Sequence, residues 1–160
     1  MRCVGLFGPP YVAWDDYDRA RQQAGVREAF AVRHEIDIVV TSLASTHDDH
    51  GDLRSFMGAE ARAKLAELDI AGDVQHQPFS STAPITEPIG NHAVTLFELA
   101  DLVKLARSED RYVILVSPPC GICHRSRADA LVPLLRSPKL KVWSHLVTDM
   151  PTARKIPKLT

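Results

Sequence analysis

Two cysteines separated by two residues stand near residue 120 of this 160-residue chain. They follow a short apolar run, residues 112–116, that predicts a buried strand, and a helical pattern comes after them. The turn Cys120-Gly121-Ile122-Cys123 is therefore placed at the start of a helix. A helix N-terminus stabilises a thiolate, and this spacing lets the second cysteine resolve a mixed disulfide. One chemistry open to the turn is dithiol oxidation and reduction.

Anion binding is a second chemistry open to the same turn. Arg125 and Arg127 follow the cysteines directly. Backbone N–H groups at a helix start and bidentate guanidinium groups both complement a phosphate. Ligands of open α/β sheets bind outside the carboxyl ends of the strands, which is where this turn is predicted to lie.

Metal binding has less support from the sequence. A single CxxC motif supplies two ligands, and His124 is adjacent to it instead of being spaced for a tetrahedral site. The loop His47-Asp48-Asp49-His50 could hold a metal or serve acid–base chemistry, but such loops commonly cap backbone groups in solvent. We predict no metal and no cofactor.

The elements that must position these residues alternate along the chain. Strands are predicted at residues 2–7, 36–41, 73–80, 112–116 and 141–148, and helices at 17–23, 26–33, 59–68, 96–106, after 123 and from 149. Thr95 and Glu98 have the spacing of a capping box at the start of the helix at 96–106. Alternation of strands and helices indicates a parallel sheet with helices on both faces. The loops after the strands at 2–7, 36–41 and 112–116 would then share one edge, which predicts a common pocket there.

Composition narrows the class of protein. Apolar residues make up 45% of the chain and charged residues 24%, which is typical of one soluble globular domain over residues 1–160. The net charge of −1 gives no general attraction to nucleic acid, and no apolar run is long enough to span a membrane. The first 16 residues make a poor signal peptide, so we predict a cytoplasmic protein with reduced thiols.

Four segments in order resemble a known family. These are IDIVVTSLAS, AGDVQHQPFS, RYVILVSPPCGICHRSRADALVPLL and VWSHLVTDMPTARKI, within residues 34–156. Together they are similar to the sugar-binding effector domain of SorC/DeoR-type bacterial transcriptional regulators. The resemblance implies a three-layer Rossmann-like parallel sheet, like that of ribose-5-phosphate isomerase and glucosamine-6-phosphate deaminase, incomplete at the N-terminus. It also implies a domain without the helix-turn-helix, which binds a sugar or sugar phosphate and assembles as a dimer or tetramer.

The chain departs from the family pattern at the turn. Arg127 stands where the family usually has lysine, and Pro118-Pro119-Cys120-Gly121 replaces a glycine pair. From the resemblance we predict that Asp73 accepts hydrogen bonds from sugar hydroxyls, that Arg127 and the backbone near Gly121 hold the anion, and that serines donate. The predicted ligand-binding residues are Ser42, Ser45, Gly72, Asp73, Ser117, Cys120, Gly121 and Arg127.

The sequence therefore favours a sugar-binding domain that is more a sensor than an enzyme and makes no direct contact with nucleic acid or membrane. Three alternatives stay open. One is a dithiol oxidoreductase with thioredoxin-like chemistry at Cys120 and Cys123. Another is a sugar-phosphate isomerase or deaminase in which Asp73 and His76 move protons, and the last is an interaction protein with no metabolite pocket. Because part of the family's domain is missing from the resemblance, we also expect self-association that covers exposed sheet or helix surface.

Overall fold

A five-stranded sheet forms the centre of the molecule in a computed structural model, which describes residues 3–47, 63–64 and 67–159. Its strand order is β4-β3-β2-β6-β7. Strands β2, β6 and β7 are parallel, whereas β3 runs antiparallel to both β2 and β4. The strand bounds are β2 Ile38–Ser45, β3 Ile70–Val74, β4 Gln77–Ser80, β6 Tyr112–Ser117 and β7 His145–Thr148.

Two helices pack on one face of this sheet. Helices α5 (Leu99–Ala106) and α6 (Ala128–Arg136) share a single apolar core with the inward-facing residues of the strands. The strand side of this core includes Leu43 and Leu115, which are fully buried. Burial of aliphatic side chains from several elements in one cluster is the main stabilising term for a domain of this size.

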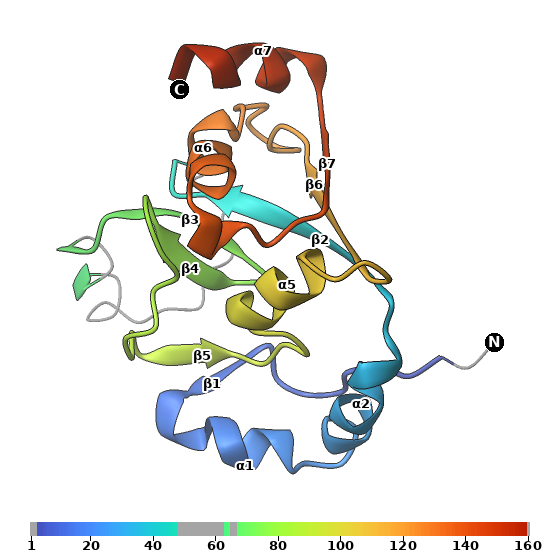
Figure 1. Cartoon of the computed structure of the whole chain (residues 1–160). Helices are drawn as coiled ribbons and strands as arrows, with labels where there is room; N and C mark the ends of the chain where they lie inside the picture. The colour runs from blue at the N-terminus through green and yellow to red at the C-terminus, as the bar shows by residue number, and fades with distance from the viewer. Residues whose placement is uncertain (1–2, 48–62, 65–66, 160) are drawn as a thin grey trace.

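A smaller unit lies at one end of the molecule (Figure 1). Strand β1 (Tyr11–Ala13) pairs antiparallel with β5 (Asn91–Ala93), next to helices α1 (Tyr17–Arg21) and α2 (Arg27–Val32). Helix α7 (Met150–Leu159) lies at the opposite end and packs on α6. None of the helices in the described part of the chain is both long and apolar enough to cross a membrane.

The first predicted strand is wrong. Of residues 2–7, those that the structure describes form no strand, and the first strand is the short β1 instead. Phe7 stays 76% exposed, whereas Leu6 packs against the buried cluster of Ala20, Val26 and Val94. The strand predicted at 36–41 extends to Ser45, because Ser42 pairs with β6 and Ser45 with β3. The helix predicted at 59–68 lies largely outside the described residues.

The strand predicted at residues 73–80 is in fact a hairpin. Gln75 and His76 form a two-residue turn between β3 and β4, with φ of 53° and 62°. Positive φ at both positions gives the backbone twist that two-residue hairpins favour, usually with Asn-Gly. The His76 N–H donates to Asp73 Oδ1 at 3.1 Å and steadies the turn. A turn without glycine or asparagine gave no signal in the sequence.

The opposite face of the sheet carries exposed apolar side chains and has no helix packed on it in the described part of the chain. Ile38, Val40 and Val147 are exposed large apolar side chains there, and Tyr112 is partly exposed beside them. The register places Val40, Ile114 and His145 in one row across three strands. Parallel strands normally carry apolar residues on both faces, because helices cover both faces. The strands of this sheet have such residues on both faces, but among the described residues helices cover only one of them.

Candidate functional site

The carboxyl ends of β2 and β6 lie side by side, as the sequence predicted. The two strands are parallel, with Thr41 opposite Leu115 and Ser42 opposite Val116. Strand β7 joins them on the other side of β6, where the Thr148 hydroxyl donates to the Ser117 carbonyl at 2.8 Å. The turns that follow these three strands therefore share one edge of the sheet.

The turn after β6 is tied down by its arginines. Arg127 Nη1 donates to the Leu43 carbonyl at 2.8 Å, and Arg125 Nη1 donates to the His47 carbonyl at 3.0 Å. Within the turn, the Cys120 N–H donates to the Arg125 carbonyl at 2.9 Å. Both guanidinium groups thus bridge the turn to the end of β2, at the edge where the ligand was predicted.

The eight predicted residues are only partly brought together. Ser45, Ser117 and Arg127 lie around the carboxyl ends of β2 and β6. Ser117 is fully buried, and its Oγ has no hydrogen-bond partner among the described residues. Ser42 instead faces the open side of the sheet, and Gly121 is exposed at the tip of the turn. Cys120 is buried within the turn.

Gly72 and Asp73 have structural partners. A Cβ at Gly72 would lie 2.4 Å from the Ala44 carbonyl oxygen and 3.0 Å from both Ala130 Cβ and Phe79 Cζ. Gly72 therefore lets helix α6 approach the sheet closely. Asp73 is buried at the start of the hairpin turn and accepts from the His76 backbone N–H. Their contact with a ligand remains a prediction.

A basic hollow lies between the start of α6 and helix α7. It has a volume of about 210 Å³, and Ser126, Asp129, Lys155 and Lys158 line it. Ser126 Oγ lies 3.0 Å from Oγ1 of the buried Thr152. Hydrogen bonds from the side chain and the backbone N–H of Thr152 lower the pKa of Asp149, the residue that precedes α7. The predicted helix start at Asp149 is confirmed.

A larger cavity, about 320 Å³, lies between β4, β5 and the start of α5. Sequence reasoning missed it because its walls come from four separated segments. They include Trp14 and His76. The cavity is bordered by the residues Trp14, His76, Gln77, Pro78, Pro84, Ile85, Thr86, Glu87, Ile89, Asn91, His92, Ala93, Glu98, Leu99 and Ala100.

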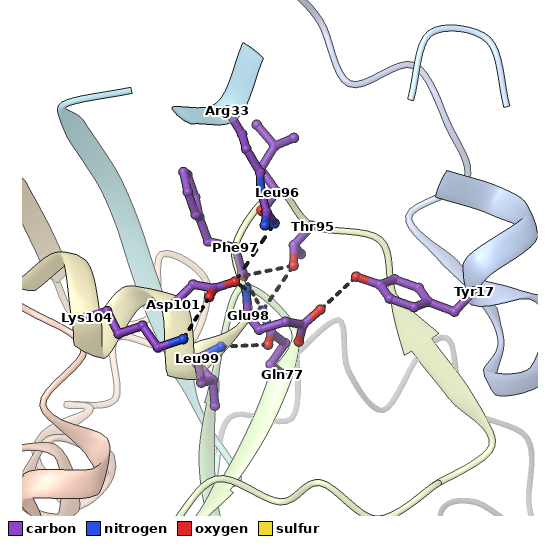
Figure 2. A network of polar contacts seen from close by, with 10 residues as sticks. All are labelled: Tyr17, Arg33, Gln77, Thr95, Leu96, Phe97, Glu98, Leu99, Asp101 and Lys104. Carbon is purple, nitrogen blue, oxygen red and sulfur yellow. Dashed lines mark hydrogen bonds and ion pairs between the residues drawn. The ribbon is translucent and has the colours of Figure 1, made fainter. Parts of the chain in front are cut away.

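A network of polar contacts fixes one wall of this cavity (Figure 2). Gln77 Nε2 donates to Thr95 Oγ1 at 3.0 Å and to the Phe97 carbonyl at 2.9 Å, and Gln77 Oε1 accepts from the Leu99 N–H. One buried amide thus joins β4 to the first turn of α5. The capping box of α5 is formed by Glu98 and Asp101, not by Thr95 and Glu98 as predicted.

Tyr17 carries this network into the smaller unit. Its hydroxyl donates to Glu98 Oε1 at 2.7 Å (Figure 2). Burial, and then the hydrogen bond to the Glu98 carboxylate, raise the pKa of Tyr17 far above its usual value. The phenol therefore stays protonated and holds the Glu98 carboxylate in place at the N-cap of helix α5.

The geometry does not support the dithiol alternative. Helix α6 begins at Ala128, so Cys120 and Cys123 lie in a turn that ends before the helix and are not at its N-terminus. The turn therefore lacks the helix N-terminus on which this alternative relied. All three cysteines, Cys3 included, are thiols in the structure. Asp73 Oδ1 accepts from the backbone N–H of His76, and the proton transfer suggested for an isomerase stays a prediction. Most of the His47–His50 loop lies outside the described residues.

Comparison with solved structures identifies the fold. A DeoR family transcriptional regulator from Listeria monocytogenes matches with a TM-score of 0.67 at 16% identity, over 94% of this chain and 57% of that one. A domain assigned as sugar-binding in a transcriptional repressor from Vibrio fischeri matches with a TM-score of 0.70 at 16% identity, over 96% and 57%. The sorbitol operon regulator SorC from Klebsiella pneumoniae matches with a TM-score of 0.63 at 15% identity, over 87% and 41%.

The predicted α/β class with a Rossmann-like sheet is confirmed by these matches, and so is the resemblance at the level of fold. The chain spans roughly half the length of the structures that it matches. No protein-family model matches the sequence, and no curated protein matches it either.

Proposed function

We propose that this chain is a small-molecule-binding effector domain whose ligand is a sugar phosphate. The observation that carries the proposal is the fold shared, over nearly the whole chain, with a sugar-binding domain of a transcriptional repressor and with two further transcriptional regulators. Fold likeness alone does not set a ligand, so the site must supply the chemistry. Cytoplasmic location and the absence of direct contact with nucleic acid stay predictions.

The phosphate is proposed to bind at the carboxyl edge of the parallel strands. Arg127, Lys155 and Lys158 bring positive charge to the start of α6, where the helix dipole adds a partial positive charge. The hydroxyl of Ser126 lies in the same hollow, and the buried Ser117 hydroxyl lies at the end of β6. These groups match an anion with hydroxyl neighbours. For the other predicted residues we propose a place near this edge but no contact with the phosphate. They are Ser42, Ser45, Gly72, Asp73, Cys120 and Gly121.

Thermal-shift measurements with a panel of sugar phosphates test the proposal. We expect a rise in Tm with at least one sugar phosphate and a smaller rise with the matching unphosphorylated sugar. The variant Lys155→Ala should weaken binding by about tenfold, because loss of one partly exposed charge contact with a phosphate removes on the order of 1–2 kcal/mol.

Lys139→Ala is the matched control, since Lys139 is an exposed lysine near the other end of α6. Inorganic phosphate serves as a second probe and separates anion binding from recognition of the sugar. A panel that leaves the Tm of the parent chain unchanged would contradict the proposal, as would equal losses in Lys155→Ala and Lys139→Ala.

Self-association through the open face of the sheet is the second part of the proposal. The side chains on this face of β2, β6 and β7 include Val40, Ile114 and Val147 and no acid, lysine or arginine. A two-fold interface sets a patch against its own copy, where like charges would repel. An apolar patch without charges avoids this repulsion, and in a dimer the partner would cover the exposed face of the sheet.

A further inference from the structure

The 320 Å³ cavity at the start of α5 is distinct in chemistry from the basic hollow at the start of α6. Among the described residues that line the cavity are the carboxylates of Glu87 and Glu98, but no lysine or arginine. Lys155 and Lys158 line the hollow. A phosphate ester in the cavity would face carboxylates without a cation to compensate, which is unfavourable at short range.

Hydrogen-bond acceptors in the cavity are held in fixed positions. His92 Nδ1 lies 2.8 Å from the Ala93 carbonyl, and a carbonyl only accepts, so Nδ1 carries the proton. In the neutral ring Nε2 is then an acceptor. The ring is stacked on Tyr17 with centroids 3.9 Å apart and meets Trp14 at 4.6 Å. Glu98 is held by the Tyr17 hydroxyl at 2.7 Å. These fixed acceptors suit a ligand that brings several hydroxyl donors.

The rest of the wall is apolar. Ile85, Ile89 and Leu99 line it together with the indole of Trp14. Small-molecule sites are typically concave and mostly apolar, with a few fixed polar groups that set the orientation of the ligand. A ring with hydroxyls at its edge and C–H groups on its faces matches both parts of this wall.

We infer that the cavity binds an uncharged, hydroxyl-rich ring, a neutral monosaccharide in chemical class, and excludes phosphate esters. The inference rests on the proposed sugar-binding function and adds a second place with its own selectivity. An effector domain built this way would distinguish a sugar from its phosphate by two separate sites.

Trp14 reports on this cavity directly. The chain has two tryptophans, and the variant Trp143→Phe leaves Trp14 as the sole indole emitter. Glucose, galactose, ribose, glucosamine and glucose 6-phosphate are titrated separately. We expect a saturable change in Trp14 emission with at least one neutral sugar and none with the phosphate. If Trp143→Phe does not fold, the indole N–H resonance of Trp14 in the parent chain, assigned by its loss in Trp14→Phe, gives the same measurement.

A blocking variant locates the site. Ala100 lines the cavity and is exposed on the first turn of α5, so Ala100→Phe fills the mouth without entering the core. We expect Ala100→Phe to weaken neutral-sugar binding at least about tenfold. Ala24→Phe, at an exposed position away from the cavity walls, should leave it unchanged.

Three outcomes overturn the inference. They are the absence of any neutral-sugar response, a response to glucosamine alone, and neutral-sugar binding that survives Ala100→Phe. A Tm rise with sugar phosphates that depends on Lys155, without any response of Trp14 to a neutral sugar, would keep the proposed function while this inference fails. Neutral-sugar binding that is lost in Ala100→Phe, with no response to any sugar phosphate, would support this inference and contradict the proposed phosphate site.

Discussion

Gly72 was predicted to contact a ligand, but the structure gives it a role in packing. The sequence placed it at a ligand edge by resemblance, but the structure shows that its missing side chain serves packing. The space that a Cβ would need is occupied by the Ala44 carbonyl oxygen, by Ala130 of α6 and by Phe79. A backbone carbonyl within a sheet cannot move aside without disturbing the pairing, so a side chain at this position forces its neighbours to shift.

Gly72→Ala is expected to lower the free energy of unfolding by about 1–3 kcal/mol, the usual cost of forcing an extra group into a packed core. Gly121→Ala is the matched control, because nothing lies within 4 Å of a Cβ at Gly121. Urea unfolding of the two variants measures the difference. Equal stability of the two variants would contradict the packing role of Gly72.

At the scale of elements, helix α7 depends on the residue that precedes it. The Thr152 N–H donates to Asp149 Oδ2 at 3.2 Å, which caps the first turn of the helix. Hydrogen bonds from Thr152, first from its side chain and then from its backbone, lower the pKa of Asp149 below the usual 3.8. The capped helix packs on α6 and forms one side of the basic hollow.

The contribution of this cap should therefore depend on pH. A folded-state pKa below the unfolded value gives stability that is present above the unfolded pKa and is lost as the pH falls through the folded one. We expect Asp149→Ala to lower the Tm at neutral pH, with the difference from the parent shrinking as the pH falls below about 4. Thermal melts at pH 7 and pH 3 measure this.

Asp149→Asn provides the control for that experiment. Asparagine is also a good N-cap and does not titrate, so the Tm of this variant should stay above that of Asp149→Ala at both pH values. A gap between the parent and Asp149→Ala that is the same at pH 7 and pH 3 would show that the carboxylate charge has no part in the cap.

At the scale of the whole molecule, the sheet is covered by helices on one face and exposes apolar residues on the other. Rows such as Val40, Ile114 and His145 run across three parallel strands. Tyr112 and His145 meet edge to face beside them, with ring centroids 5.5 Å apart. An apolar surface of this kind on a small domain marks an interface more often than a free surface.

Val40→Asp is expected to convert the chain from a dimer or higher oligomer to a monomer, since it would place a carboxylate opposite its copy. Ile122→Asp is the control. Ile122 is 68% exposed and Val40 65%, but Ile122 lies in the turn after β6 and away from the face. Sedimentation velocity at several concentrations measures the mass of both. A parent chain that is monomeric throughout would refute the interface.

The carboxyl-edge region shows how far sequence patterns reach. The dense β-branched runs of β2 and β6, each followed by small and polar residues, fixed two parallel neighbours and the edge at which their turns meet. This followed because strand period and apolar content are local properties. The reversal of β3 could not be predicted, since a Gln-His turn with positive φ carries no common signal.

Local patterns in this chain therefore determined its class, the order of its main elements and one edge where a ligand could bind. The tertiary structure alone decided which side chains share a wall. The cavity joins Trp14, Glu87, His92 and Glu98 from segments whose spacing has no periodic relation. It also decided that Gly72 serves packing and Ser42 faces outward, because the face on which a side chain lies depends on the register set by partners distant in the sequence.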